Sequence, residues 1–173
     1  PGWQAGHGTW PTKVAGPSRN LNWIRSGPLA LDRANIRAAV EGSLQRLQTD
    51  YIDLYQLHWP ERNQPMFGQW QFNPDKERTC TPISEQLFAL AELVREGKIR
   101  QIGVSNEHPW GIMEFRRIAA ACGLPAIAST QNAYNLLNRT FETGLAEVCH
   151  REQVGLLAYS PLGFGLLTGK YDQ

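Results

Sequence analysis

Polar side chains follow each segment that the sequence predicts as a strand, and together they could act on a carbonyl group. In the stretch YIDLYQLHWPER, an apolar strand at 51–57 runs directly into His58 and Trp59. A neutral histidine can orient a carbonyl, a lysine can lower the pKa of a neighbouring acid, and amides can hold a carboxamide ring, which are the demands of hydride transfer. The side chains at these strand ends are Lys13, His58, Ser105, Asn106, Gln131, Asn132, Tyr159 and Ser160.

Each of these residues also has a simpler interpretation. Lys13 could be a solvated lysine and His58 a structural histidine, each favoured about two to one when taken alone. The serine and amide side chains could cap helices or bond loop backbone, and Trp59 could pack in the core. The succession of polar strand ends is more specific than any one residue, because the carboxyl ends of parallel strands meet at one face.

The elements that must position these residues alternate along the chain. Apolar residues at helical spacing predict helices at 31–47 with Asp32 as N-cap, at 84–97 with Ser84 as cap, at 109–123 and from Thr140 to Cys149. Predicted strands lie at 12–15, 51–57, 98–106, 126–131 and 154–159, and residues 59–82 form a long polar loop.

This alternation is typical of an α/β protein whose parallel strands are joined by right-handed crossovers. The candidates are a doubly wound sheet and part of a (β/α)8 TIM barrel. The absence of G-x-G-x-x-G after the first strand argues against a dinucleotide-binding doubly wound domain. A closed barrel needs eight strands, whereas about five parallel strands and four or more helices are predicted, so we expect a partial barrel at 12–173 after an irregular segment at 1–11.

Composition limits the partners and the compartment. The formal net charge of +1 over 173 residues gives no reason to expect a nucleic acid or an anionic membrane surface as partner. No apolar run is long enough to span a bilayer, and no secretory signal is visible. Cys80, Cys122 and Cys149 are widely spaced and form no C-x-x-C, so we expect reduced thiols, no metal site and a cytoplasmic protein.

Five runs in the chain closely resemble the aldo-keto reductases, and most of all their bacterial Tas-type branch, which is similar to the potassium-channel β subunits. The runs are TKVAGPSRN, SLQRLQTDYIDLYQLHWP, LVREGKIRQIGVSN, TQNAYNLLNR and LLAYSPLGFGLLTGKY. They cover roughly residues 12–173 in the family's order and spacing. The resemblance implies a (β/α)8 barrel that binds NADP(H) and reduces aldehydes and ketones to alcohols.

The resemblance also implies residue roles. Lys13 matches the lysine that lowers the pKa of the family's catalytic tyrosine, His58 matches the histidine that orients the substrate carbonyl, and Trp59 sits where the family often lines its substrate pocket. The cofactor positions divide into three groups. Ser105, Asn106 and Gln131 match the residues that bind the nicotinamide carboxamide. Tyr159 matches the aromatic residue that stacks on the nicotinamide ring. The segment over the pyrophosphate is matched by Ser160, Leu162, Gly163 and Lys170.

Two catalytic residues of the family pattern are not found. The family's catalytic aspartate and tyrosine lie upstream of the lysine, and residues 1–12 contain neither residue type. We therefore expect a fragment that lacks its general acid, a contribution typically worth about 10²–10⁴-fold in rate. The alternatives are a non-catalytic nicotinamide- or partner-binding module and a half-barrel that self-associates through its open sheet edges.

Overall fold

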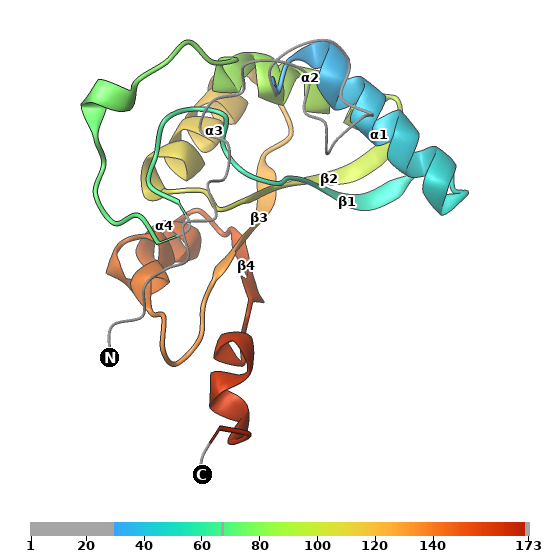
Figure 1. The fold of residues 1–173 in the computed structure, drawn as a ribbon. Coiled ribbons are helices and arrows are strands. Elements are labelled where there is room, and N and C mark those ends of the chain that lie inside the picture. The colour runs from blue at the N-terminus through green and yellow to red at the C-terminus, as the bar shows by residue number, and fades with distance from the viewer. Residues whose placement is uncertain (1–29, 67, 172–173) are drawn as a thin grey trace.

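A parallel sheet of four strands organises the computed structural model, which describes residues 30–66 and 68–171. The strands lie in the order β1-β2-β3-β4, so each one pairs with the strand that follows it in the chain (Figure 1). They are β1 (Ile52–Leu57), β2 (Ile99–Ser105), β3 (Ile127–Ala133) and β4 (Gly155–Tyr159).

This sequential order decides between the two predicted architectures. A doubly wound sheet reverses its strand order at a switch point, whereas a barrel adds each new strand beside the preceding one. The fold is therefore an open arc of a (β/α)8 barrel, as predicted. The predicted strand at 12–15 and the irregular segment at 1–11 lie outside the described residues.

The helices alternate with the strands and contact one another in chain order, α1 with α2, α2 with α3, and α3 with α4. None of the described helices is both long and apolar enough to cross a membrane. The helices are α1 (Arg33–Leu47), α2 (Ile83–Arg95), α3 (Pro109–Cys122) and α4 (Leu145–Arg151), with shorter 3-10 turns η1 (Pro74–Lys76), η2 (Thr140–Thr143) and η3 (Gly163–Thr168).

The helix ends confirm some sequence predictions and correct others. Asp32 caps α1, because its Oδ1 accepts a hydrogen bond from the backbone N–H of Asn35 at 2.8 Å. The prediction that Ser84 caps the second helix is wrong. Pro82 occupies the N-cap position with an extended ψ of 145°, so Ser84 already lies inside the first turn. Gly123 ends α3 in a left-handed conformation with φ 62°.

The single helix predicted from Thr140 is also interrupted. Residues Thr140–Thr143 form the 3-10 turn η2, and α4 begins only at Leu145. Between them Gly144 has φ 177° and ψ −37°, an extended φ that breaks the helical path. Apolar spacing alone does not reveal this break, because the residues on both sides keep a helical pattern.

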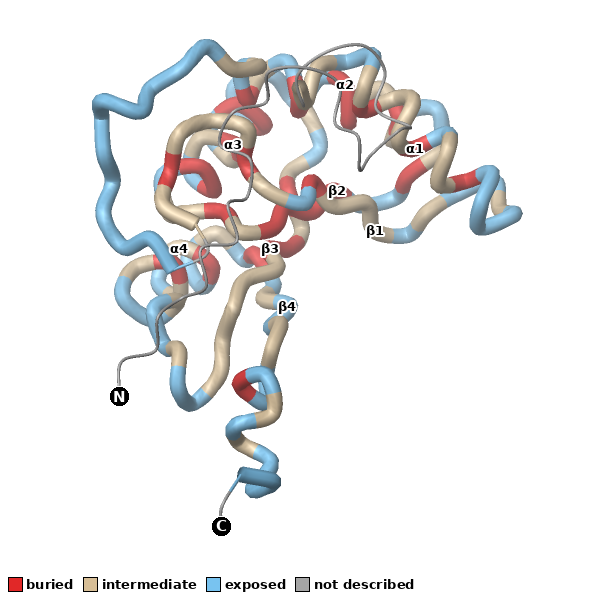
Figure 2. The backbone as a smooth tube through the Cα atoms, in the orientation of Figure 1, coloured by how far each residue is buried: buried red, intermediate tan, exposed pale blue. Residues whose placement is uncertain are grey.

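The core lies between the helices and one face of the sheet, and Figure 2 shows the buried residues concentrated there. On this face Tyr55 of β1 is paired with Ile102 of β2, and Leu57 with Val104. Alternate residues point the other way, as in any strand, so Leu54, Gln56 and Gly103 share the opposite face, which corresponds to the barrel interior. Among the largest fully buried side chains are Val40, Leu87, Leu90, Ile102 and Phe115.

Candidate active site

Hydrogen bonds to the main-chain carbonyl of Gln131 connect the carboxyl ends of β2 and β3. Ser105 is the register partner of Gln131, and its Oγ donates a hydrogen bond to that carbonyl at 2.8 Å. The backbone N–H of Asn106 donates to the same oxygen at 2.9 Å. The parallel register of the two strands therefore fixes where Ser105 and Asn106 stand at the edge of the sheet.

Asn106 connects this pair to the ends of two more strands. Its Nδ2 donates to the carbonyl of His58, after β1, at 3.0 Å and to Ser105 Oγ at 3.2 Å. Its Oδ1 accepts a hydrogen bond from the hydroxyl of Tyr159, the last residue of β4, at 2.8 Å. The structure thus brings together five predicted site residues from four strand ends, with Asn106 at the centre.

Asn106 adopts the left-handed conformation, with φ 54°. Asparagine tolerates this region better than most residues because its short polar side chain can hydrogen-bond locally. The turn redirects the chain from β2 toward α3 while it holds the side-chain amide over the strand ends.

Tyr159 keeps its proton in this setting. Burial raises the pKa of the Tyr159 phenol above its usual value near 10. The hydroxyl is therefore a donor throughout the neutral range, and Asn106 Oδ1 is its acceptor.

His58 and Trp59 lie just past the end of β1. The His58 side chain is exposed, and its ring centroid lies 4.3 Å from that of Trp59 with an interplanar angle of 36°. The carbonyl of His58 accepts a hydrogen bond from Asn106, and its imidazole lies beside the indole at a tilt. The pair presents an imidazole and an indole at the same edge as Ser105.

The segment after β4 folds into a tight turn. The backbone N–H of Gly163 donates to the Ser160 carbonyl at 2.9 Å, and Asn135 Nδ2 donates to the same oxygen at 2.9 Å. Ser160 and Gly163 are both left-handed, with φ 54° and 56°. Gly163 is buried, whereas Leu162 is exposed.

The remaining two predicted residues are Lys13 and Lys170. Lys13 lies outside the described residues. Lys170 follows η3, where its Nζ lies 4.7 Å from the ring centroid of Tyr171. Within the part of the chain that the structure describes, no hydrogen bond or ion pair links Lys170 to the strand-end residues.

Sequence reasoning missed several polar residues that support the site. Gln56 Nε2 lies 3.4 Å from Gln131 Oε1, and Gln64 Nε2 donates to the Asn106 carbonyl at 2.6 Å. Glu107 is buried and paired with Arg62. The alternation along β1, two residues before His58, could have identified Gln56. Arg62 and Gln64 lie in a loop without periodicity, so no local pattern identifies them.

Beside the strand ends, Trp59, Ser105 and Glu107 are among the residues that line a small cavity of about 10 Å³. A cavity of about 290 Å³ lies between α2 and α3, and its lining includes Cys80, Trp110 and Arg117. The described residues also contain no group of three or more His, Cys, Asp or Glu side chains placed to share a metal ion.

The chemistry of the donor set fits a nicotinamide carboxamide. That group needs a hydrogen-bond acceptor for its NH₂ and a donor for its carbonyl, and Ser105, Asn106 and Gln131 supply both kinds of atom at one edge. Ser105 Oγ and both polar atoms of the Asn106 side chain already have partners within the protein. A bound carboxamide would therefore exchange some of these hydrogen bonds for its own.

Comparison with known proteins agrees with this geometry. Residues 11–173 match the family described as "Aldo/keto reductase family". The chain is 51% identical to "Protein tas" of Escherichia coli (strain K12) over 174 residues, which cover 98% of this chain and 50% of that protein. It is 48% identical to an aldo-keto reductase of Babesia bovis over 170 residues, covering 92% and 60%.

A third relative, the "NADH-specific methylglyoxal reductase" of Escherichia coli (strain K12), is 37% identical over 139 residues, or 80% of this chain and 36% of that protein. The chain thus spans about half the length of the two relatives that it most resembles among these three.

Proposed function

Because the chain belongs to the aldo/keto reductase family, in the branch of Protein tas, we propose that it supplies the nicotinamide-binding strand ends of an NADP(H)-dependent reductase of aldehydes and ketones. The observation that carries this proposal is the hydrogen-bonding of Asn106 to His58, Ser105 and Tyr159. These hydrogen bonds bring His58, Ser105 and Tyr159 to one edge, which supports the proposal that the edge orients a carbonyl and binds a carboxamide.

In this proposal the strand-end residues position the reactants. Ser105, Asn106 and Gln131 would hold the carboxamide, and the ring of Tyr159, whose hydroxyl is bonded to Asn106, would pack on the nicotinamide. When bound, the nicotinamide supplies the hydride. The turn formed by Ser160, Leu162 and Gly163, with Lys170 beyond it, would hold the pyrophosphate.

On the substrate side, His58 donates to the carbonyl oxygen and Trp59 lines the pocket. Hydrogen-bonding to that oxygen stabilises the negative charge that develops there during reduction. Lys13 lowers the pKa of the general acid that donates a proton to the reduced carbonyl oxygen. We place this activity in the cytoplasm, since the cysteines among the described residues, Cys80, Cys122 and Cys149, are free thiols.

Cofactor titration tests the binding half of the proposal. NADPH and NADH are titrated separately into the protein, and binding is followed by nicotinamide fluorescence. We expect saturable binding with NADPH preferred, and about a tenfold weaker affinity in Ser105→Ala. Ser43→Ala is the matched control, because Ser43 Oγ also donates to a backbone carbonyl, that of Ala39, but within α1. Equal affinity in the two serine variants would contradict the assignment of Ser105.

Turnover tests the catalytic half. In the full protein, the absorbance of NADPH is followed with benzaldehyde as the carbonyl substrate. His58→Ala is compared with His150→Ala on α4. We expect the first substitution to reduce kcat by about 10²-fold and the second to leave it unchanged. An unaffected kcat in His58→Ala would overturn the role of His58.

A second candidate function rests on one sequence observation. Residues 1–12 contain no tyrosine or aspartate, whereas the family takes its proton donor from that region. We propose that residues 1–173 expressed alone bind the nicotinamide without reducing a carbonyl. Saturable NADPH binding without benzaldehyde-dependent NADPH consumption is the expected result, and family-level reduction by residues 1–173 would exclude this candidate.

A further inference from the structure

We propose that Arg62 and Glu107 form a buried positioning pair that holds Asn106 in its ligand-binding orientation by clamping the loop after β1 onto the turn after β2. The inference deepens the proposed function and rests on it, since it concerns the residue at the centre of the carboxamide site. In the described part of the chain, no hydrogen bond joins the side chain of Arg62 or Glu107 to the side chains of the carboxamide set. Both act through Gln64 and the backbone of the turn.

The pair is bidentate and desolvated. Arg62 Nη1 donates to Glu107 Oε2 at 2.9 Å, and Arg62 Nη2 contacts Glu107 Oε1. Glu107 is 2% exposed, and the Arg62 side chain is 16% exposed. Glu107 Oε1 also accepts from the backbone N–H of His108 at 2.7 Å. The fork of the guanidinium against a planar carboxylate fixes the relative orientation of the two residues.

From this pair a short chain of hydrogen bonds leads to Asn106. Arg62 Nη2 donates to Gln64 Oε1 at 2.9 Å, and Gln64 Nε2 donates to the main-chain carbonyl of Asn106 at 2.6 Å. On the other side, Asn132 Nδ2 donates to the carbonyl of Glu107 at 3.1 Å. The strained left-handed turn at Asn106 is thus held at its own carbonyl and at that of the next residue.

A glycine makes room for the pair. Gly111 is the third residue of α3, and a Cβ built there would overlap both the Glu107 carboxyl and Arg62 Nη2. The first turn of α3 therefore lies directly against the ion pair. The neighbouring Trp110 covers the guanidinium, with Arg62 Cζ 5.0 Å from the centre of its ring.

Stability alone is a poor account of this arrangement. A buried ion pair loses so much hydration that hydrophobic residues of similar volume often stabilise a fold as well or better. The pair instead joins residues 45 apart in sequence, one in the loop that carries His58 and Trp59 and one next to Asn106. Its position between the two halves of the proposed site favours a role in orienting them.

The test uses three variants of the full protein and one control. Arg62→Gln removes the pair, and Gln64→Met breaks the link to Asn106 while it leaves the ion pair in place. Arg62→Lys keeps the charge but not the fork. Arg151→Gln is the matched control, because it opens the exposed Arg151–Glu147 pair on α4. Each protein is measured well below its melting temperature for NADPH affinity and for the NMR resonances of the Asn106 side-chain amide.

We expect Arg62→Gln and Gln64→Met to shift the Asn106 amide resonances and to weaken NADPH binding by about tenfold or more. Compared with Arg62→Gln, Arg62→Lys should restore the melting temperature more fully than the NADPH affinity. The control, Arg151→Gln, should change neither the Asn106 resonances nor the affinity. A lower melting temperature with unchanged Asn106 resonances and affinity in Gln64→Met would overturn the inference.

The two proposals fail in different ways. If the unsubstituted protein does not bind NADPH, the proposed function falls, but the Asn106 resonances still decide the positioning role. Unchanged resonances in both Arg62→Gln and Gln64→Met then overturn that role, and shifted resonances support it. If Arg62→Gln does not fold, Gln64→Met carries the comparison.

Discussion

At the scale of the residue, Asn106 combines a backbone role with a side-chain role. Its left-handed φ of 54° turns the chain out of β2. Its side chain makes hydrogen bonds to His58 after β1, to Ser105 at the end of β2 and to Tyr159 at the end of β4. Most residue types could not fill both roles, because a Cβ-bearing residue without a local hydrogen bond is disfavoured in the left-handed region by roughly 1–2 kcal/mol.

Two substitutions at Asn106 separate these roles. Asn106→Gly removes the side chain but tolerates the backbone conformation, whereas Asn106→Ala removes the side chain and strains the turn. We expect equal losses of NADPH affinity and a free energy of unfolding about 1 kcal/mol lower for Ala than for Gly. Urea denaturation and cofactor titration measure the two effects. Equal stability of the two variants would show that the turn relaxes and that φ at this position is not constrained.

The sequence predicted which residues gather at the strand ends, but not which hydrogen bonds connect them. Polar residues after successive strands were sufficient to predict that His58, Ser105 and Asn106 lie together at the strand ends. The partners of Asn106 depend on the distance between strand ends that are 48 and 53 residues apart in the chain. The buried Arg62–Glu107 pair depends in addition on the path of an aperiodic loop, and composition carries no signal for that path.

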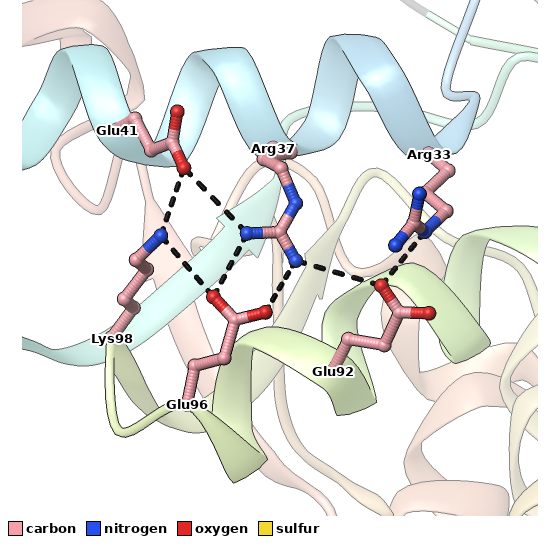
Figure 3. A network of polar contacts seen from close by, with 6 residues as sticks. All are labelled: Arg33, Arg37, Glu41, Glu92, Glu96 and Lys98. Carbon is pink, nitrogen blue, oxygen red and sulfur yellow. Dashed lines mark hydrogen bonds and ion pairs between the residues drawn. The ribbon is translucent and has the colours of Figure 1, made fainter.

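At the scale of the element, α1 is attached to α2 by a network of charges as well as by apolar packing (Figure 3). Arg37 donates to Glu96 at 2.8 Å and lies 3.5 Å from Glu92. Lys98 bridges Glu41 at 2.8 Å and Glu96 at 3.2 Å. Hydrogen bonds from Arg37 and Lys98 lower the pKa of Glu96 to about 2.

Substitution of Arg37 tests this network. A carboxyl whose folded pKa is lowered contributes stability above its unfolded pKa near 4.5, and that contribution is lost as the pH falls toward about 2. We expect Arg37→Met to lower the melting temperature by about a few degrees at neutral pH and low salt, and to have little effect near pH 2 or in about 1 M salt. Arg151→Met, in an exposed pair within one helix, is the control. A loss that persists in high salt would mean that Arg37 acts through packing of its aliphatic stem.

Gly103 offers a test of the sheet itself. A Cβ at this position of β2 would lie 2.8 Å from both Gln56 Cγ and Ser129 Oγ, whereas a Cβ at Gly155 of β4 would meet only Ala128 O at 3.6 Å. We expect Gly103→Ala to destabilise the fold by about 1–3 kcal/mol through overpacking. Gly155→Ala should be neutral or slightly stabilising, because it restricts the unfolded chain. Thermal and urea unfolding measure both, and equal stabilities would show that Gln56 and Ser129 move aside freely.

Element boundaries were predictable where a local signal exists. Asp32 was recognised as the N-cap of α1, and glycine marked the end of α3. The break at Gly144 was not recognised, since a glycine within a helical pattern is compatible with a continuous helix. Strand β3 runs two residues further than predicted, to Ala133, because pairing with β4 extends it past the polar residues that suggested a loop.

At the scale of the whole molecule, the described sheet is an arc with β1 and β4 at its ends. Alternation of helices and strands predicted the barrel architecture, because each crossover in this fold is local in sequence. A closed barrel has eight strands, and the chain spans about half of Protein tas. The interior face of the arc is therefore the surface that we expect to decide whether residues 1–173 associate with other chains.

We predict that residues 1–173 expressed alone self-associate through this face and its edges. Leu157 of β4 is the register partner of Gln131, so both side chains point to the barrel interior, and Leu157 is 42% exposed there. An apolar residue on an unpaired edge favours association between chains. Sedimentation at increasing protein concentration should show a mass that rises with concentration, and Leu157→Lys should suppress that rise. Leu47→Lys, at the end of α1, makes the same chemical change at a residue that is 64% exposed, so it should not alter the rise. A concentration-independent monomer, or equal suppression by both substitutions, would show that the arc is not the surface through which the chains associate.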